Sequence, residues 1–126
     1  MLFRSSQLHQ NGINALIYDH GMIYTGGDDG TITEILLQDD PHVRQQRLQC
    51  HSGHVMGLAK TSTHLVSCSI DQRMTFFKGM IFDKQLFSHV SDIHAMVAWN
   101  NGEDDHVVVV GNGLEMFSYH TLEHLE

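Results

Sequence analysis

The chain has little proline, little charge and no long apolar run. Pro41 is the only proline among 126 residues, and 17% of the residues are charged, against roughly 25% in ordinary soluble domains. Because 41% of the residues are hydrophobic, the composition excludes a disordered chain, which would be charge-rich and poor in apolar residues. No apolar stretch approaches the roughly 18 residues of a transmembrane helix, and the initial MLFRSSQ has no secretory apolar stretch. We therefore expect a soluble, cytoplasmic protein without a membrane partner.

Basic residues and cysteines are also scarce. Seven Lys and Arg residues stand against 15 Asp and Glu residues, which leaves a net charge of −8. This balance argues against a surface that wraps nucleic acid unaided, because phosphate binding needs clustered cations. Cys50 and Cys68 are too few for a disulfide framework, so we expect two reduced, buried thiols. Histidine is abundant, with 11 residues, which suits metal binding, pH sensing or a repeated structural histidine.

The sequence contains an internal repeat, and such a repeat decides the fold. The segment HQNGINALIYDHGMIYTGGDDGTITEIL, from His9, aligns with HSGHVMGLAKTSTHLVSCSIDQRMTFF, from His51, at a constant spacing of 42 residues. A third copy begins at His89, 38 residues after His51. The aligned anchors are His9 with His51, Ile13 with Val55 and Ile93, Leu16 with Leu58 and Met96, Asp29 with Asp71, and Ile35 with Phe77.

Each copy predicts short strands separated by turn signals. The expected strands are 13–18, 22–27, 31–36 and 43–49 in the first copy, 55–60, 64–69, 74–77 and 81–87 in the second, and 93–99, 106–110 and 114–119 in the third. Asp29-Gly30 is a tight-hairpin signal, and no segment predicts a helix. The first two strands of each copy are apolar at successive positions, as in strands buried on both faces, whereas the fourth strand is polar, like an exposed edge. This gradation predicts all-β propeller units.

These residues resemble the WD-repeat family of β-propellers. The family's unit, or blade, carries a His four residues before an apolar anchor, a hydroxyl residue in the second strand and an Asp in the following turn. Asp accepts a hydrogen bond from His and the hydroxyl extends this buried chain. The resemblance assigns a structural hydrogen-bond network to His9, Thr25, Asp29, His51, Ser67, Asp71 and His89.

The chain also departs from the family pattern. In the third copy Asn112-Gly113 replaces the Asp turn, so we expect an incomplete network there. The position of the family's Trp holds Ile35, Phe77 and Phe117, and the glycine that usually precedes the His is absent. These departures indicate degenerate repeats.

A closer resemblance covers roughly residues 8 to 119. The segments HQNGINAL, SGHVMGL, VSCSIDQRMTFF, VSDIHAM and VGNGLEMFSY are similar to the C-terminal end of large WD-repeat proteins that partner an FtsJ-like tRNA methyltransferase. The resemblance implies a non-catalytic scaffold that supports 2′-O-methylation of the wobble nucleoside in the anticodon loop. It also implies indirect tRNA contact, no cofactor and no enzymatic activity of its own. A generic protein-interaction adaptor in signalling or growth control remains the alternative.

Enzymatic and metal sites are less favoured interpretations. His9, His51 and His89 belong to separate units, without CxxC or HExxH spacing, so we expect no metal site. Ser67, His51 and Asp71 are the three residue types of a hydrolase triad, but the sequence around Ser67 lacks a nucleophile elbow. We therefore expect no catalytic residue.

One rim carries a candidate partner surface made of Trp99, Glu103, Asp104 and Asp105. An aromatic residue at a propeller rim can anchor a partner. A core position for Trp99 and a solvated acidic loop are the simpler interpretations.

The repeats predict one partial propeller over residues 1–126, with units at about 9–50, 51–88 and 89–119 and a leading outer strand at about 2–8. Three units fall short of the roughly four to eight blades of a closed ring, and each unit needs neighbours to bury its faces. We expect the chain to belong to a longer ring or to pair with another copy, in which case two copies would supply six units.

Overall fold

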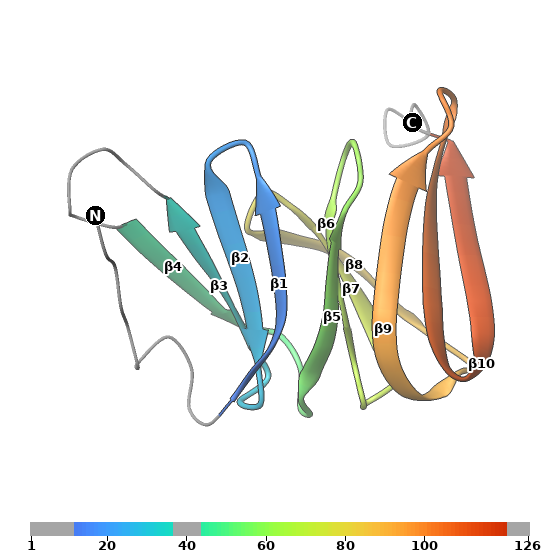
Figure 1. The fold of residues 1–126 in the computed structure, drawn as a ribbon, viewed down its shortest axis with the longest axis horizontal. Helices are drawn as coiled ribbons and strands as arrows, with labels where there is room; N and C mark the ends of the chain where they lie inside the picture. Colours follow the sequence, from blue (N-terminus) through green and yellow to red (C-terminus); the bar gives the residue numbers. More distant parts are fainter. Residues whose placement is uncertain (1–11, 37–43, 121–126) are drawn as a thin grey trace.

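The computed structural model describes residues 12–36 and 44–120. All of the regular secondary structure in these two ranges is β-strand (Figure 1). The strands form three antiparallel sheets that follow one another along the chain. The first sheet contains β1 (Ile13–Asp19), β2 (Met22–Gly27), β3 (Thr31–Leu36) and β4 (Arg44–Gln49). The second contains β5 (Val55–Lys60), β6 (Leu65–Ser69), β7 (Arg73–Lys78) and β8 (Ile81–Phe87), and the third contains β9 (Ser91–Asn100) and β10 (Asp104–His120). The prediction of an all-β fold is confirmed.

Strands that follow one another in sequence are also neighbours in the first two sheets, so these sheets are meanders in chain order. His20 and Gly21 have φ values of 48° and 82°, the left-handed conformations that a two-residue hairpin turn requires. Gly30, in the predicted hairpin between β2 and β3, has φ 76°. A Cβ there would lie 2.2 Å from the carbonyl oxygen of His51, so this turn accepts only glycine and lies directly against the start of the second sheet.

Element β10 reverses direction within its own length (Figure 1). Its first part pairs with β9 from Asp105 opposite Asn100 to Val110 opposite Ala95. His106 Nδ1 and Ser118 Oγ lie 2.7 Å apart although they are 12 residues apart in sequence, a separation that would span roughly 40 Å in an extended strand. The third sheet therefore has three arms, as predicted, with the reversal near Asn112-Gly113.

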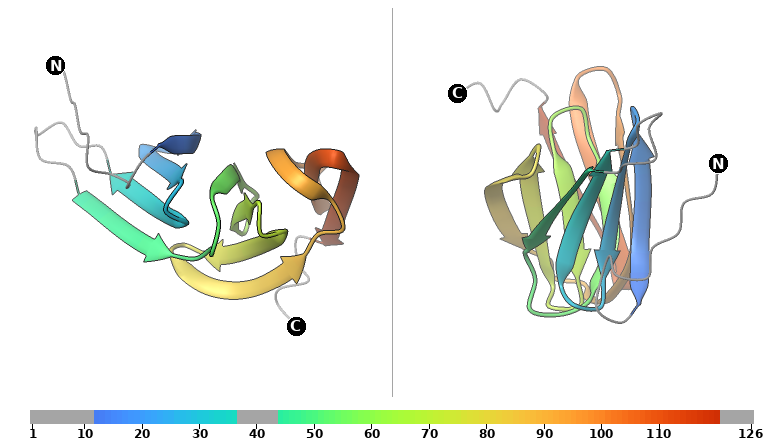
Figure 2. Two further views of the ribbon diagram at one scale, coloured as in Figure 1. Left: turned by 90° about the horizontal axis from the view of Figure 1, so that it is seen from below. Right: turned by 90° about the vertical axis from the view of Figure 1, so that its left-hand side faces the viewer.

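The three sheets fan out from β1, β5 and β9, which lie side by side, while β4 and β8 lie at the outer side (Figure 2). In the part of the chain described, this fan is an open arc. We call the side of a sheet that faces the preceding sheet its front face and the opposite side its back face. The front faces of the second and third sheets pack on the back face of the sheet before them. In the first sheet we use front face for the equivalent side, which carries Leu16 at the position of Leu58.

Two apolar clusters fill the spaces between the sheets. Between the first and second sheets, the back-face residues Tyr24 and Ile32 meet the front-face residues Val55, Leu58, Leu65 and Phe77. Between the second and third sheets, the back-face residues Val66, Cys68, Met74 and Phe76 meet Ile93, Val107 and Val109. β6 is buried at all of its positions, as predicted for a strand covered on both faces. β1 instead alternates: Ala15 and Ile17 pack inward, while Leu16 and Tyr18 are exposed.

Some predictions concern residues outside the described ranges. The leading strand at about 2–8 and His9 belong to this group. Within residues 12–36 and 44–120, no helix is long and apolar enough to cross a membrane.

Candidate functional site

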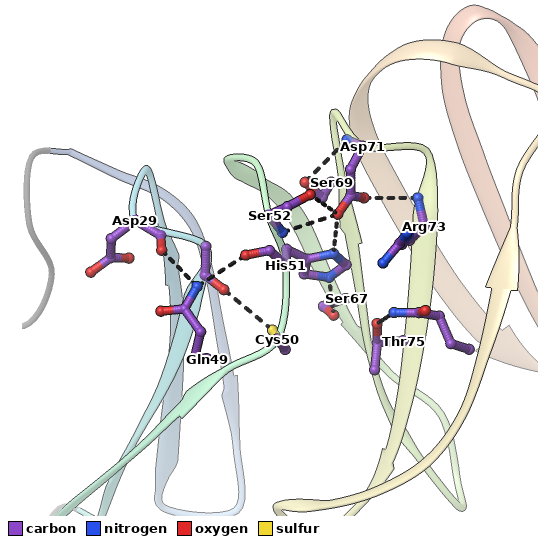
Figure 3. A network of polar contacts seen from close by, with 12 residues as sticks. Asp29, Gln49, Cys50, His51, Ser52, Ser67, Ser69, Asp71, Arg73 and Thr75 are labelled. Carbon is purple, nitrogen blue, oxygen red and sulfur yellow. Dashed lines mark hydrogen bonds and ion pairs between the residues drawn. The ribbon is translucent and has the colours of Figure 1, made fainter.

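A buried chain of hydrogen bonds crosses the second sheet (Figure 3). His51 lies in the loop before β5, Ser67 in β6, and Asp71 in the turn between β6 and β7. His51 Nδ1 donates to Asp71 Oδ2 at 3.2 Å, and His51 Nε2 accepts from the Ser67 hydroxyl at 2.8 Å. A carboxylate only accepts hydrogen bonds, so Asp71 sets this imidazole tautomer. The structure thus brings together His51, Ser67 and Asp71 as the repeat pattern implied.

The surroundings of the pair keep His51 neutral and Asp71 ionised. Burial lowers the pKa of His51, and this effect outweighs the opposing attraction of Asp71. Burial alone would raise the pKa of Asp71, but hydrogen bonds from the backbone amides of Arg73 and Ser52, together with His51, lower it. The carboxylate therefore also closes the loop before β5 onto the turn after β6.

Asp71, His51 and Ser67 share the connectivity of a hydrolytic triad, but a substrate cannot reach the hydroxyl. Ser67 is fully buried, and the His51 side chain has no exposed surface. A nucleophile must contact the reacting atom, so this geometry serves the fold.

The polar contacts of the first sheet involve Asp28, which was not among the predicted network residues. Asp29 accepts from the backbone and hydroxyl of Thr31, and Thr25 is buried in β2. The neighbouring Asp28 accepts from the Gly12 amide at 3.1 Å and from Asn14 Nδ2 at 2.6 Å. Two adjacent carboxylates therefore accept hydrogen bonds in this turn. The Asp28-Asp29 pair in the sequence was the available signal for this.

The first and second sheets are also joined by Gln49. Its Nε2 donates to the carbonyl oxygens of Asp29 at 3.1 Å and His51 at 3.0 Å (Figure 3). The two predicted network positions are therefore linked through backbone atoms across the sheet boundary.

In the third sheet the predicted role of the His89 side chain is wrong, because its imidazole is exposed. Its backbone N–H instead donates to Glu115 Oε1 at 3.0 Å, and the Ser88 hydroxyl donates to the same oxygen at 2.8 Å. The Asn112-Gly113 turn supplies no carboxylate, and the acceptor comes from the returning arm of β10. Only the reversal of β10 brings Glu115 to this loop, so residue spacing could not reveal it.

The candidate partner surface is split by the structure. Trp99 is exposed and stacks on His106 with ring centroids 5.1 Å apart, and Glu103 is exposed while Asp104 is half-buried. The prediction is wrong for Asp105, whose side chain is buried.

Asp105 instead ties the third sheet to the second. It accepts from the Ser62 hydroxyl at 3.0 Å and from Asn100 Nδ2 at 2.8 Å. Burial would raise the pKa of Asp105, but these hydrogen bonds lower it below its ordinary value. Strand alternation in VVVV was the available signal, because it places Asp105 on the same face as Val107 and Val109.

A second buried histidine was not anticipated. His64 Nε2 donates to Asp83 Oδ2 at 2.8 Å, which lowers the pKa of Asp83. The ring also meets Phe76 edge-on, with centroids 5.7 Å apart. This pair joins the start of β6 to β8 at the opposite rim from His51.

Other described features that could bind a ligand are modest. Two open grooves of about 380 Å³ and 240 Å³ run along β1, β5 and β9. Residues 12–36 and 44–120 contain no cluster of three or more His, Cys, Asp or Glu side chains able to hold a metal ion. Cys50 and Cys68 are free, and burial raises the pKa of each thiol to about 12.

Comparison with known proteins supports the fold. No protein-family model and no curated protein sequence matches the chain. The chain is similar to BBS1N in a crystal structure of BBS1N in complex with ARL6DN, soaked with lead, with a TM-score of 0.60 and 15% sequence identity. The match covers 79% of this chain and 35% of that chain, so this chain spans about a third of its neighbour. Such a likeness shows a β-propeller-like arrangement of antiparallel sheets.

Proposed function

We propose that the three sheets are blades of a WD-repeat propeller and that the chain is part of a non-catalytic scaffold. The observation that carries this proposal is the hydrogen-bond chain from Asp71 through His51 to Ser67. It joins the residues to which the WD-repeat resemblance gives a structural role, and it leaves the hydroxyl buried. Propeller blades supply surfaces, whereas their function depends on what those surfaces bind.

The complex that this scaffold serves is a tRNA-modifying one, supporting 2′-O-methylation of the wobble nucleoside by an FtsJ-like methyltransferase. Support comes from the resemblance of the segments around VSCSIDQRMTFF and VGNGLEMFSY to the WD-repeat partner of that enzyme. The net charge of −8 is consistent with a segment that contacts protein more than phosphate. In this proposal the methyltransferase supplies the reaction and the propeller positions the tRNA.

Deletion of the gene tests the proposal directly. Mass spectrometry of the wobble nucleoside should show loss of its ribose methyl group, and expression of the wild-type protein should restore it. Purified methyltransferase should modify tRNA poorly alone and efficiently after addition of the full-length protein. Deletion of the methyltransferase gene is the matched control. Unchanged wobble methylation after deletion of the scaffold gene would overturn the proposal.

A generic protein-interaction adaptor is the second candidate, and the outer edge of the second sheet favours it. Ile81, Phe82 and Phe87 of β8 are exposed, and apolar side chains of this size on an edge strand suit a protein contact. Affinity purification of the full-length protein distinguishes the two candidates. Recovery of the methyltransferase supports the first, whereas recovery of other proteins that are lost on Phe82→Asp substitution supports the adaptor.

A further inference from the structure

We propose that the exposed back face of the third sheet binds the exposed front face of the first sheet of a second copy, so that two chains associate head to tail. The inference concerns the chain's own assembly and does not rest on a role in tRNA modification.

The two internal boundaries show what covers a sheet face in this protein. At both, a back face rich in apolar side chains meets an apolar front face, and the contacting residues are almost fully buried. Lys60 Nζ and Asp19 Oδ2 form an ion pair of 3.2 Å at the rim of the first boundary. Front-to-back packing therefore occurs twice in the described residues and defines a repeatable contact.

The third sheet has a back face of the same kind, and none of the described residues covers it. In the aligned repeats Leu114 and Met116 occupy the positions of Met74 and Phe76, because Phe117 takes the place of Phe77. Met74 and Phe76 are 0% and 1% exposed, whereas Leu114 and Met116 are 66% and 55% exposed. Phe117 packs toward the second sheet, so its neighbours Leu114 and Met116 alternate to the back face.

Strand register places Val97 on the same surface. Val97 pairs with Val108 as Ala59 pairs with Val66 in the second sheet. Ala59, the equivalent of Val97, is 5% exposed, whereas Val97 is 59% exposed. Trp99, two residues along β9, extends the back face to the rim.

The first sheet presents the complementary front face. Ile13 and Leu16 stand 42 residues before Val55 and Leu58. Val55 and Leu58 are 0% and 5% exposed beneath the first sheet, but Ile13 and Leu16 are 48% and 66% exposed. These two repeat positions are therefore buried in the second sheet, which packs on the first, and exposed in the first sheet, on which no described sheet packs from this side.

A second copy is the occupant that suits both faces together. The first and third sheets lie at opposite ends of the open arc (Figure 2), and each chain carries one face of each kind. Two copies can form two equivalent front-to-back contacts and close as a cyclic dimer, which leaves no such face open. Pairing of two back faces would instead be a contact that the described residues never make.

Light scattering of the purified 126-residue chain tests this inference. The expected particle has twice the mass of the 14.3 kDa chain. Leu16→Asp should weaken association about tenfold or more by placing a charge in one face, and Met116→Asp should do the same in the other. Ile81→Asp is the matched control, because Ile81 is exposed on β8 and lies on neither face.

Mixing the two variants separates loss of contact from loss of fold. Each variant keeps one intact face, so the mixture should form a heterodimer through a single unaltered contact, which misfolded variants could not do. Dimerisation that tolerates Leu16→Asp but not Met116→Asp would indicate back-to-back pairing and overturn the inference. A wild-type monomer would also overturn it, including one whose back face binds the methyltransferase.

Discussion

Both ring nitrogens of His51 have partners although its side chain is buried. This arrangement satisfies three polar groups at once in a sheet that has an apolar cluster packed on each of its faces. Buried polar groups without partners are costly, so a satisfied network defines one loop conformation. Histidine here is a structural residue whose neutral form the fold requires.

Replacement of Ser67 by Ala should lower the free energy of unfolding by about 1–3 kcal/mol, because His51 Nε2 would remain buried without its donor. Urea denaturation measures the change. Ser118→Ala is the matched control, since Ser118 is exposed and its hydrogen bond to His106 lies at the surface; we expect a change within about 0.5 kcal/mol. Equal effects of the two substitutions would contradict a structural role for the network.

Acidification should destabilise the protein through His51. Burial lowers the pKa of His51 in the folded chain, whereas in the unfolded chain it is about 6.5. As the pH falls through that value, the unfolded state binds a proton that the folded state does not, and unfolding becomes more favourable. The lowered pKa of Asp71 adds a further loss only below about pH 3.9.

Urea midpoints measured between about pH 7.5 and pH 5.5 test this pH dependence. His51→Gln should show a smaller decrease than the wild type over this range. His94→Gln is the control, because His94 is exposed on β9, and it should keep the wild-type decrease. A wild-type slope that persists in His51→Gln would count against this assignment.

Strands of adjacent sheets approach closely where one of them carries glycine. A Cβ on Gly26 of β2 would lie 2.4 Å from Val55 Cγ1, so the boundary between the first and second sheets depends on a missing side chain. At the next boundary a polar contact adds to the apolar cluster, because Asp105 of β10 accepts a hydrogen bond from Ser62 in the loop after β5. The two boundaries therefore respond to different substitutions.

Gly26→Ala should destabilise the protein by about 1–3 kcal/mol through overpacking against Val55. Val55→Ala should be destabilising alone, because it removes buried methyl groups. In the double variant the shortened side chain relieves the clash, and the total loss should be smaller than the sum of the two single losses. A thermal or urea denaturation cycle measures this coupling, and strict additivity would show that the two residues do not meet.

Asp105→Ala should lower the free energy of unfolding by about 1–3 kcal/mol, because the hydrogen bonds that its buried carboxylate accepts from Ser62 and Asn100 would be lost. Glu103→Gln, in the same loop but exposed, should change stability by less than about 0.5 kcal/mol. Chemical denaturation of both variants checks the difference. A tolerated Asp105→Ala substitution would contradict its role in joining the two sheets.

The fan of three sheets leaves apolar faces at both of its ends, and stability should therefore depend on association. A dimer that unfolds to monomers is stabilised by mass action, so the melting temperature should rise with protein concentration. Added salt should strengthen the dimer, because it screens the repulsion between two chains of charge −8. Calorimetry over a hundredfold concentration range measures the first effect and sedimentation at two salt concentrations the second. A melting temperature independent of concentration would contradict head-to-tail association.

The spacing of residues was enough to predict the strands and the hairpin at Asp29-Gly30, whereas the meeting of His51 with Asp71 was implied by the resemblance to WD-repeat propellers. These features follow from local geometry: alternation and turn residues act over a few positions, and a repeat places equivalent residues in equivalent surroundings. Glu115 as the acceptor for the His89 loop, Asp105 as a link between sheets and the pair of His64 with Asp83 depended on tertiary packing. The first two join residues that only a strand reversal or a sheet boundary brings together, and the third joins the start of β6 to β8, which are not neighbouring strands in the second sheet. The exposed faces at Leu16 and Met116 have the same origin, since burial of a repeated apolar position is decided by whether a neighbouring sheet lies upon it.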